Sequence, residues 1–481
     1  MLFQSLDFII FLPIVFTLFW LLQNHLKLQN ALIFVASYVF YGWWDWRFLF
    51  LILFSTCVDY FAGLQIENAQ TEKKRKFYLW LSMLVNLGFL MYFKYANFFI
   101  DNFVEAFKFM GYSFDIQHIN VILPVGISFY TFQTMSYTID VYNGKLKPTK
   151  DFIAFGAFVS FFPQLVAGPI ERATNLLPQF YQTKTFDYAL ATDGMRQILW
   201  GFFKKVVIAD QSAVFVNEIF ENYTGYNGSS LFFGAFFFSL QIYGDFSGYS
   251  DIAIGTAKLF GFQLMQNFAY PYFSRDIAEF WRRWHISLST WFRDYLYIPL
   301  GGSQGGTWMK IRNTFIIFLV SGFWHGANWT FIFWGFLNAC YFLPFLLLNI
   351  NRKNIDIVAK GRLLPNFKEI IMIGITYLMT IFAWIFFRAE NIGKAFYYVA
   401  GIFSPSLFQK PDFLGLFPKG FIFPLLLFFV VEWLGREGKY PLEKLLISNK
   451  RLMRWSFYIL LILFIGLFKR PDNVEFIYFQ F

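Results

Sequence analysis

The sequence has little charge for its length. Asp, Glu, Lys and Arg make up 15% of its 481 residues, against roughly a quarter in soluble domains. Hydrophobic residues make up 57%, and phenylalanine alone occurs 72 times. This composition excludes a disordered chain and a water-soluble multidomain enzyme. It predicts an all-α integral membrane protein with many spans, forming one domain over residues 1–481.

Cysteine and the motifs of several enzyme classes are also scarce. Cys57 and Cys340 both lie inside apolar runs, and no disulfide framework or metal set can be built from them. The sequence contains no phosphate-binding P-loop, no His-Glu-x-x-His and no Cys-x-x-Cys. These absences disfavour an ATP-driven pump and a zinc enzyme. We expect no metal and no permanently bound cofactor.

Apolar runs follow one another along the whole chain, and many are interrupted. A spanning helix needs about 20 residues, and several runs are shorter or carry Gly, Pro or Asp. Such pieces are typical of broken or re-entrant helices that line a protein-enclosed cavity. We therefore expect about 11 transmembrane helices together with re-entrant segments. The final residues, 476–481, are too short to span, and we expect them at the membrane interface.

Basic residues predict the orientation of the chain. The formal charge is +10, but the basic residues lie in short segments between apolar runs, which disfavours nucleic-acid binding. The run Lys73–Lys76 joins the third and fourth apolar runs and is expected in a cytoplasmic loop. Counting back three spans places the N-terminus outside a multi-pass protein of the cell (inner) membrane.

Residues 275–313 form an amphipathic segment that we expect on the cytoplasmic side. Large apolar residues recur three or four positions apart within it, on one face of a helix: Phe280, Trp284, Leu288, Trp291 and Tyr295. This spacing predicts a continuous helix over residues 275–300, lying near the membrane surface with Ser274 as its N-cap.

Two of the four histidines directly follow a tryptophan. His325 lies between two apolar runs whose outer flanks are both expected to be cytoplasmic, so it lies deep in the membrane or near its outer side. A histidine at that depth suits a general base, although a neutral histidine bonded to a neighbouring helix is equally compatible. His285 lies in the amphipathic segment, where an interfacial histidine packing beside Trp281 is the simpler interpretation.

Acidic residues within an apolar run form a third candidate. Asp245, Ser247 and Asp251 lie in Tyr243-Gly-Asp-Phe-Ser-Gly-Tyr-Ser-Asp251. Intramembrane acids are functional candidates by default. A structural cluster of polar side chains that holds helices together is the alternative.

Taken together, these segments resemble the membrane-bound O-acyltransferase (MBOAT) family, in the bacterial branch typified by the alginate O-acetylation membrane protein. The resemblance runs almost from end to end and shows no departure at either histidine. It is carried by Tyr41–Trp46, Pro124–Phe132, Phe162–Ile170, Asp245–Asp251, Phe280–Trp291 and Gly322–Gly326.

The resemblance implies a fold, an activity and partners. The fold would be a ring of tilted helices around a central funnel or tunnel. The family's hallmark histidine falls on His325, and its second, cytoplasmic-side histidine falls on His285. The activity would move an acyl group, here acetyl, from a cytoplasmic thioester donor such as acetyl-CoA to an acceptor outside. An extracytoplasmic acetyltransferase partner would complete delivery to an exported, alginate-like polysaccharide.

Residue roles follow from this chemistry. A hydroxyl attacks a thioester only when a base removes its proton, and His325 would be that base. Asp245, Ser247 and Trp324 would orient the histidine or the donor. Arg282 and Arg283 would meet the phosphates of coenzyme A, although simple anchoring at the positive cytoplasmic face is the alternative.

Other functions remain open at this point. Peptidoglycan or teichoic acid could be the acceptor in the same mechanism. A transporter or flippase would also use broken helices and an intramembrane acid such as Asp245, but it predicts an internal repeat, which the sequence lacks. A non-catalytic scaffold for a partner enzyme predicts tolerance of changes at His285 and His325.

Overall fold

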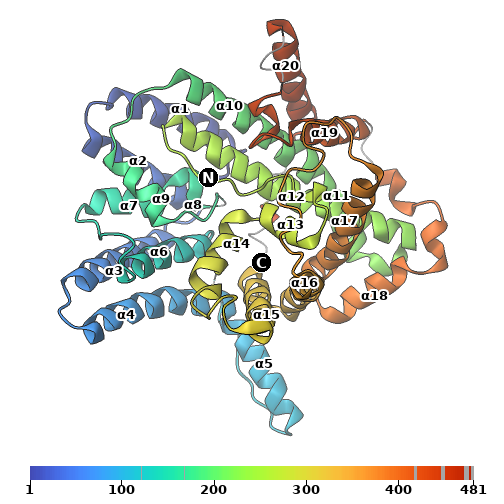
Figure 1. Cartoon of the computed structure of the whole chain (residues 1–481), viewed down its shortest axis with the longest axis horizontal. Helices are drawn as coiled ribbons and strands as arrows, with labels where there is room; N and C mark the ends of the chain where they lie inside the picture. The colour runs from blue at the N-terminus through green and yellow to red at the C-terminus, as the bar shows by residue number, and fades with distance from the viewer. Residues whose placement is uncertain (121, 167, 417–419, 446–449, 471–475, 478–481) are drawn as a thin grey trace. The chain divides into compact units, whose positions relative to one another are not determined.

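All regular structure in the described part of the chain is helical, as the composition predicts (Figure 1). The computed structural model describes residues 1–120, 122–166, 168–416, 420–445, 450–470 and 476–477. By its internal contacts the chain divides into two compact units. Unit 1 comprises Met1–Gly194 and Thr256–Met265, and unit 2 comprises Met195–Gly255 and Gln266–Phe481.

Unit 1 is built from the N-terminal helices. They are α1 (Leu6–Leu21), α2 (Leu26–Gly42), α3 (Phe48–Asn68), α4 (Glu72–Leu90), α5 (Ala96–Phe109), α6 (Ile127–Tyr142), α7 (Phe152–Ser160), α8 (Phe162–Leu165) and α9 (Ala173–Leu176). A 3-10 turn follows at Leu177–Tyr181, and the division between the units falls within α10 (Tyr188–Phe202) and again within α12 (Gly228–Leu259).

A buried acid holds three helices of unit 1 together. Asp59 of α3 accepts hydrogen bonds from Nδ2 of Asn86 on α4 at 3.0 Å and from the hydroxyls of Ser82 on α4 and Thr138 on α6. These polar groups satisfy one another inside an apolar bundle, which is the role of a structural polar cluster.

The basic run at the start of α4 is helical rather than part of a loop. Thr71 caps the helix, and Lys73–Lys76 lie in its first turns. From Glu72 the helix continues through a π-helical turn at Met91–Tyr95 to Phe109, a total of 38 residues. At 1.5 Å per residue this rod is longer than the roughly 30 Å hydrocarbon core of a bilayer.

Unit 2 carries the remaining helices. They are α11 (Asp210–Glu221), α13 (Ile277–Arg283), α14 (Ile286–Phe292), α15 (Gly306–His325), α16 (Trp329–Leu347), α17 (Phe367–Arg388), α18 (Ile392–Ile402), α19 (Ile422–Gly435) and α20 (Arg451–Phe468). Two π-helical turns lie at Phe203–Ala209 and Arg293–Tyr297, and short 3-10 turns occupy Tyr223–Gly225, Pro271–Phe273, Pro405–Phe408, Asp412–Leu416 and Pro441–Glu443.

Within the described residues, five helices are long and apolar enough to cross a membrane, which fits a multi-pass membrane protein. They are Phe48–Asn68, Glu72–Phe109, Trp329–Leu347, Phe367–Arg388 and Arg451–Phe468. Three shorter apolar helices lie at Leu6–Leu21, Phe152–Leu165 and Ile422–Gly435. The larger number of spans inferred from the sequence stays a prediction, as does a single domain over the whole chain.

The prediction of one continuous helix over residues 275–300 is wrong. The segment forms α13 and α14, separated at Trp284 and His285, where His285 has a left-handed backbone with φ of 45°. Asp276, not Ser274, caps α13 by accepting a hydrogen bond from the Glu279 amide at 2.7 Å. Most of the apolar stripe, including Trp284 and Trp291, is buried in unit 2 rather than laid on a surface.

The prediction for the end of the chain is tested only in part. Phe476 and Ile477 are buried against α12 in unit 2, and the amide of Ile477 donates to Asp245 at 2.7 Å. These two residues therefore dock within the protein, and their expected position at the membrane interface stays a prediction. Residues 478–481 lie outside the described part.

Candidate active site

A helical hairpin places His325. It is the last residue of α15, and α16 begins at Trp329 after a turn in which Asn328 caps α16 by accepting from the Thr330 amide at 3.0 Å. The two helices pack side by side in Figure 1. Gly322 and Gly335 permit this, since a Cβ on either would collide with a backbone carbonyl of the other helix. The predicted hairpin is therefore confirmed.

A break in a helix places His285. The segment that follows α12 runs along the break: Ala269 N donates to Arg283 O at 3.0 Å, and Ile286 N donates to Asn267 O at 2.9 Å. These two bonds hold the strained left-handed backbone of His285. Its side chain is 1% exposed, so His285 is buried within the protein, and the expected position at the membrane interface stays a prediction.

The structure brings the two histidines together within unit 2. The ring centroids of His285 and His325 lie 6.4 Å apart. His325 is 3% exposed. Trp324 contacts both rings: its ring centroid lies 6.1 Å from that of His285 and 4.9 Å from that of His325. Two ionisable rings thus lie buried close together, and Trp324 packs against both; its predicted role in orienting the histidine or the donor stays a prediction.

Aromatic side chains from several helices surround the two histidine rings. Trp334 of α16 and Phe387 of α17 meet the His325 ring edge to face, at 5.2 and 5.3 Å. On the other side, Phe246 of α12 meets the His285 ring at 4.6 Å. Walls of this kind exclude water, and a proton transfer or a developing charge inside them is governed by the few polar groups present.

Asn267 is the polar partner of His285, and the sequence analysis missed it. Its Oδ1 lies 3.1 Å from Nδ1 of His285 and accepts from the Ser287 hydroxyl at 2.9 Å. Its Nδ2 donates to the Ser250 hydroxyl of α12 at 3.1 Å. No sequence signal marks Asn267, because the contact joins two segments that the chain brings together only on folding.

Asp245 and Asp251 belong to a buried ionic cluster with two lysines. Lys204 Nζ lies 2.5 Å from Asp251, and Lys205 Nζ lies 2.8 Å from Asp245 and from Asp210. Both lysines lie on the π-helical turn beside α12. These acids therefore fit the structural alternative, in which opposite charges neutralise each other away from water. Two lysines inside an apolar run were the signal that could have predicted this cluster.

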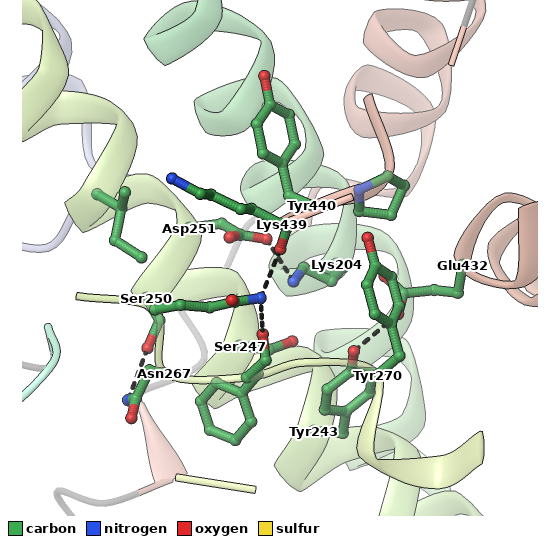
Figure 2. A pocket seen from close by; sticks show the side chains of 14 residues that line it. Lys204, Tyr243, Ser247, Ser250, Asp251, Asn267, Tyr270, Glu432, Lys439 and Tyr440 are labelled. Atoms are coloured by element: carbon green, nitrogen blue, oxygen red, sulfur yellow. Dashed lines mark hydrogen bonds and ion pairs between the residues drawn. The ribbon is translucent and has the colours of Figure 1, made fainter. Parts of the chain in front are cut away.

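Ser247 faces a small polar cavity instead of either histidine. The cavity has a volume of about 10 Å³, enough for about one water molecule. Lys204, Ser250 and Asn267 share its lining, as Figure 2 shows. The Ser247 hydroxyl is buried there and has no hydrogen-bond partner among the residues that the structure describes. A cavity of this size admits water but not an acyl donor.

Arg282 and Arg283 bind the chain segment that follows α16. Arg282 donates to the carbonyls of Asn351 and Asn354, each at 2.6 Å. Arg283 pairs with Glu279 at 2.8 Å and donates to the Asp356 carbonyl at 2.9 Å. These contacts fasten residues 351–356 to α13. A role for either arginine toward donor phosphates stays a prediction.

Burial of the imidazole lowers the pKa of His285 to about 3. The imidazole is therefore neutral at physiological pH and has one protonated nitrogen. Among the described residues, no group of three or more His, Cys, Asp or Glu side chains could hold a metal ion.

Comparison with known proteins gives a family match that spans the residues of this site. The sequence profile of the MBOAT, membrane-bound O-acyltransferase family, matches residues 146–388, which include both histidines. The probable alginate O-acetylase AlgI of Pseudomonas aeruginosa is 42% identical over 416 residues, covering 86% of this chain and 76% of the relative. The peptidoglycan O-acetyltransferase of Helicobacter pylori is 35% identical over 421 residues, covering 82% and 77%.

A more distant similarity covers the middle of the chain. The teichoic acid D-alanyltransferase of Bacillus subtilis is 30% identical over 244 residues, covering 46% of this chain and 60% of the relative. The family profile covers half of the chain, and the longer matches extend well beyond it. The chain therefore belongs to the membrane-bound O-acyltransferase family.

Proposed function

We propose that the protein transfers an acetyl group from a cytoplasmic thioester, acetyl-CoA, to an extracytoplasmic acceptor for O-acetylation of an exported, alginate-like polysaccharide. The observation that carries this proposal is the buried pair of His285 and His325, whose ring centroids lie 6.4 Å apart. An enclosed pair of imidazoles suits acyl transfer, because the reaction needs a proton removed from one substrate and given to another.

The residues support a direct sequence of bond changes. A neutral His325 accepts the proton of the acceptor hydroxyl as its oxygen attacks the thioester carbonyl carbon. The tetrahedral intermediate collapses, the carbon–sulfur bond breaks, and the thiolate takes the proton from the imidazolium. Ester and thiol are the products, and the histidine is neutral again. The aromatic walls keep water from hydrolysing the thioester.

The position of the site in the membrane completes the proposal. The N-terminus lies outside, a ring of about 11 tilted helices encloses a funnel, and the donor enters from the cytoplasm. An extracytoplasmic acetyltransferase partner carries the group onward to the polymer. The positive-inside distribution of Lys and Arg supports this orientation. Asp245 and Ser247 do not contact the reacting atoms and support the site only indirectly, through α12.

The acceptor distinguishes two versions of this function. The AlgI relatives of this chain are named for alginate and the Helicobacter pylori relative for peptidoglycan. The higher identity to the first group favours an exopolysaccharide. Supplying alginate-like polymer and peptidoglycan in parallel assays separates them, because label accumulates in the preferred acceptor.

The test is transfer from radiolabelled acetyl-CoA by purified protein, with its extracytoplasmic partner, into polymer. His325→Ala should lose transfer by about 10²–10⁴-fold, the usual contribution of a general base. His25→Ala is the matched control, because His25 is exposed at the start of α2. Equal transfer by wild type and His325→Ala would remove His325 from the chemistry. Substrate flipping in liposomes without a thioester would favour a transporter.

A further inference from the structure

Asn267 lies where α12 has ended and the chain passes the break between α13 and α14. It is fully buried. Its carbonyl accepts from the Ile286 amide at 2.9 Å, and the neighbouring Ala269 amide donates to Arg283 O at 3.0 Å. The backbone on both sides of the side chain is therefore fixed. The Asn267 amide is presented to His285 by an anchored segment.

The contacts of the side chain identify its atoms. The Ser287 amide can only donate, and it points at one terminal atom of Asn267 at 3.3 Å, so that atom is the oxygen. The other terminal atom is then the nitrogen, and it donates to the Ser250 hydroxyl at 3.1 Å, a bond that Figure 2 shows. The assignment follows from the network and not from an arbitrary choice of amide orientation.

The oxygen of Asn267 determines which nitrogen of His285 carries the proton. Nδ1 of His285 lies 3.1 Å from that oxygen. An amide oxygen only accepts hydrogen bonds, so a hydrogen bond between the two atoms requires a proton on Nδ1. Nδ1 is therefore protonated, and Nε2 on the opposite edge of the ring carries the lone pair. The backbone strain at His285, with φ of 45°, is held by the same segment.

We propose that Asn267 is a positioning residue of the active site, which holds His285 in the Nδ1–H tautomer so that Nε2 exchanges the proton with substrate. This inference rests on the proposed acyl transfer at the His285–His325 pair. In the reaction Nε2 receives the proton that His325 has removed from the acceptor hydroxyl and gives it to the leaving thiolate, while Nδ1–H stays bonded to Asn267. The amide thus stabilises the imidazolium that forms in between, and it keeps the ring from turning.

The charged groups near His285 do not replace this partner. On α12, Asp245 and Asp251 pair with Lys205 and Lys204. On α13, Glu279 pairs with Arg275 and Arg283. On α15, His325 is the titratable group that faces the ring. The Ser287 hydroxyl also lies near Nδ1, at 3.5 Å, against 3.1 Å for the Asn267 oxygen. It donates its proton to that same oxygen at 2.9 Å, so toward Nδ1 it can only accept.

The scarcity of histidine permits a direct test. The chain has four histidines, so ¹⁵N-histidine labelling gives few signals, and His285→Gln identifies those of His285. At neutral pH we expect Nδ1 protonated and Nε2 unprotonated in the wild type, and a mixture of tautomers in Asn267→Ala. A wild-type His285 protonated on Nε2 overturns the inference. This readout requires no acyl transfer, so it decides the matter even if the proposed function fails.

Kinetic measurements provide a second test of the role of Asn267. Asn267→Asp places a carboxylate on Nδ1–H, which stabilises the imidazolium and raises the pKa of His285. Because His285 must be neutral to receive the proton from His325, the acidic limb of the pH–rate profile should move to higher pH. Asn267→Ala should lower kcat about tenfold, by analogy with losing one hydrogen bond in the transition state, with KM unchanged. Asn391→Asp, at the exposed N-cap of α18, is the matched control and should keep the wild-type profile. An unchanged profile in Asn267→Asp, with His325→Ala inactive, overturns the inference but leaves the proposed function standing.

Discussion

His285 and His325 face each other across 6.4 Å between ring centroids, although one lies at the break between two short helices and the other at the tip of a hairpin. Neither position depends on its neighbours in sequence alone. The hairpin needs the close approach of α15 and α16, and the break needs the segment around Asn267. The pair is therefore a property of the folded unit 2.

Replacing both histidines should lower the rate of acetyl transfer little more than replacing one of them. Residues that act as a unit in one reaction are strongly non-additive. We expect His285→Gln and His325→Gln each to lower the rate of acetyl transfer by about 10²–10⁴-fold, and the double variant to lie within about tenfold of the slower single variant. Initial rates of the four proteins complete the cycle. Losses that multiply would show that the two rings contribute independently.

Gly322 should not tolerate a methyl group. A Cβ on Gly322 would collide with the carbonyl of Phe331, because α15 and α16 touch there. We expect Gly322→Ala to destabilise the protein by about 1–3 kcal/mol, as overpacking does, and to reduce activity by shifting His325. Thermal unfolding in detergent measures the first effect.

Gly374→Ala is the control for this prediction. Gly374 lies in α17, and nothing lies within 4 Å of the position of an added Cβ. Alanine should be neutral there or stabilise the helix by up to about 1 kcal/mol. If both alanine variants behaved alike, the close contact of the hairpin would not explain the effect at Gly322.

Hydrophobic runs predicted the helical class and the hairpin that carries His325, because both follow from local periodicity and length. The break at Trp284 and His285 could not be predicted in this way. Its apolar stripe has the spacing of a continuous helix, and pairing with Asn267 and Ala269 overrides that local preference. Burial of the stripe likewise depends on contacts distant in the sequence.

The ionic cluster in α12 is a different case. Asp245 and Asp251 were recognised as intramembrane acids, whereas Lys204 and Lys205, in another apolar run, were not matched to them. Buried charges need partners of opposite sign, so the pairing was accessible from the sequence. Its geometry was not, because it depends on the π-helical turn that places the two lysines side by side.

Replacing one member of the Lys204–Asp251 pair should destabilise the protein more than replacing both members. Lys204→Met leaves a buried carboxylate without its cation, and Asp251→Asn leaves a buried ammonium without its anion. Either change should destabilise the protein by about 3–5 kcal/mol. The double variant removes both charges of this pair and should be more stable than both, while Glu432 loses the nearby charge of Lys204 in Lys204→Met and in the double variant alike. Melting temperatures in detergent give the order, and a double variant less stable than either single change would contradict it.

Arg282→Ala should release the segment that follows α16. Arg282 makes hydrogen bonds to the carbonyls of Asn351 and Asn354, so its loss should increase proteolysis within residues 351–356. KM should change equally for acetyl-CoA and acetyl-pantetheine, which lacks the nucleotide phosphates. A rise in KM confined to acetyl-CoA would instead assign Arg282 to the donor phosphates. Lys310→Ala, a change of another cation in the amphipathic segment, controls for general loss of positive charge.

Glu171→Gln should alter how the stability of unit 1 depends on pH. Burial raises the pKa of Glu171 from 4.5 to about 7, against the opposing effect of its bonds from Asn175 and the Met265 amide. A raised carboxyl pKa gives stability that is complete below pH 4.5 and lost as pH rises through 7. Between pH 5 and 8, the free energy of unfolding of the uncharged variant should therefore rise relative to that of the wild type by up to about 3 kcal/mol. Thermal unfolding across this range measures the gain, with Glu105→Gln on the exposed face of α5 as control. A difference that stays constant with pH would mean that the buried carboxyl does not titrate on unfolding.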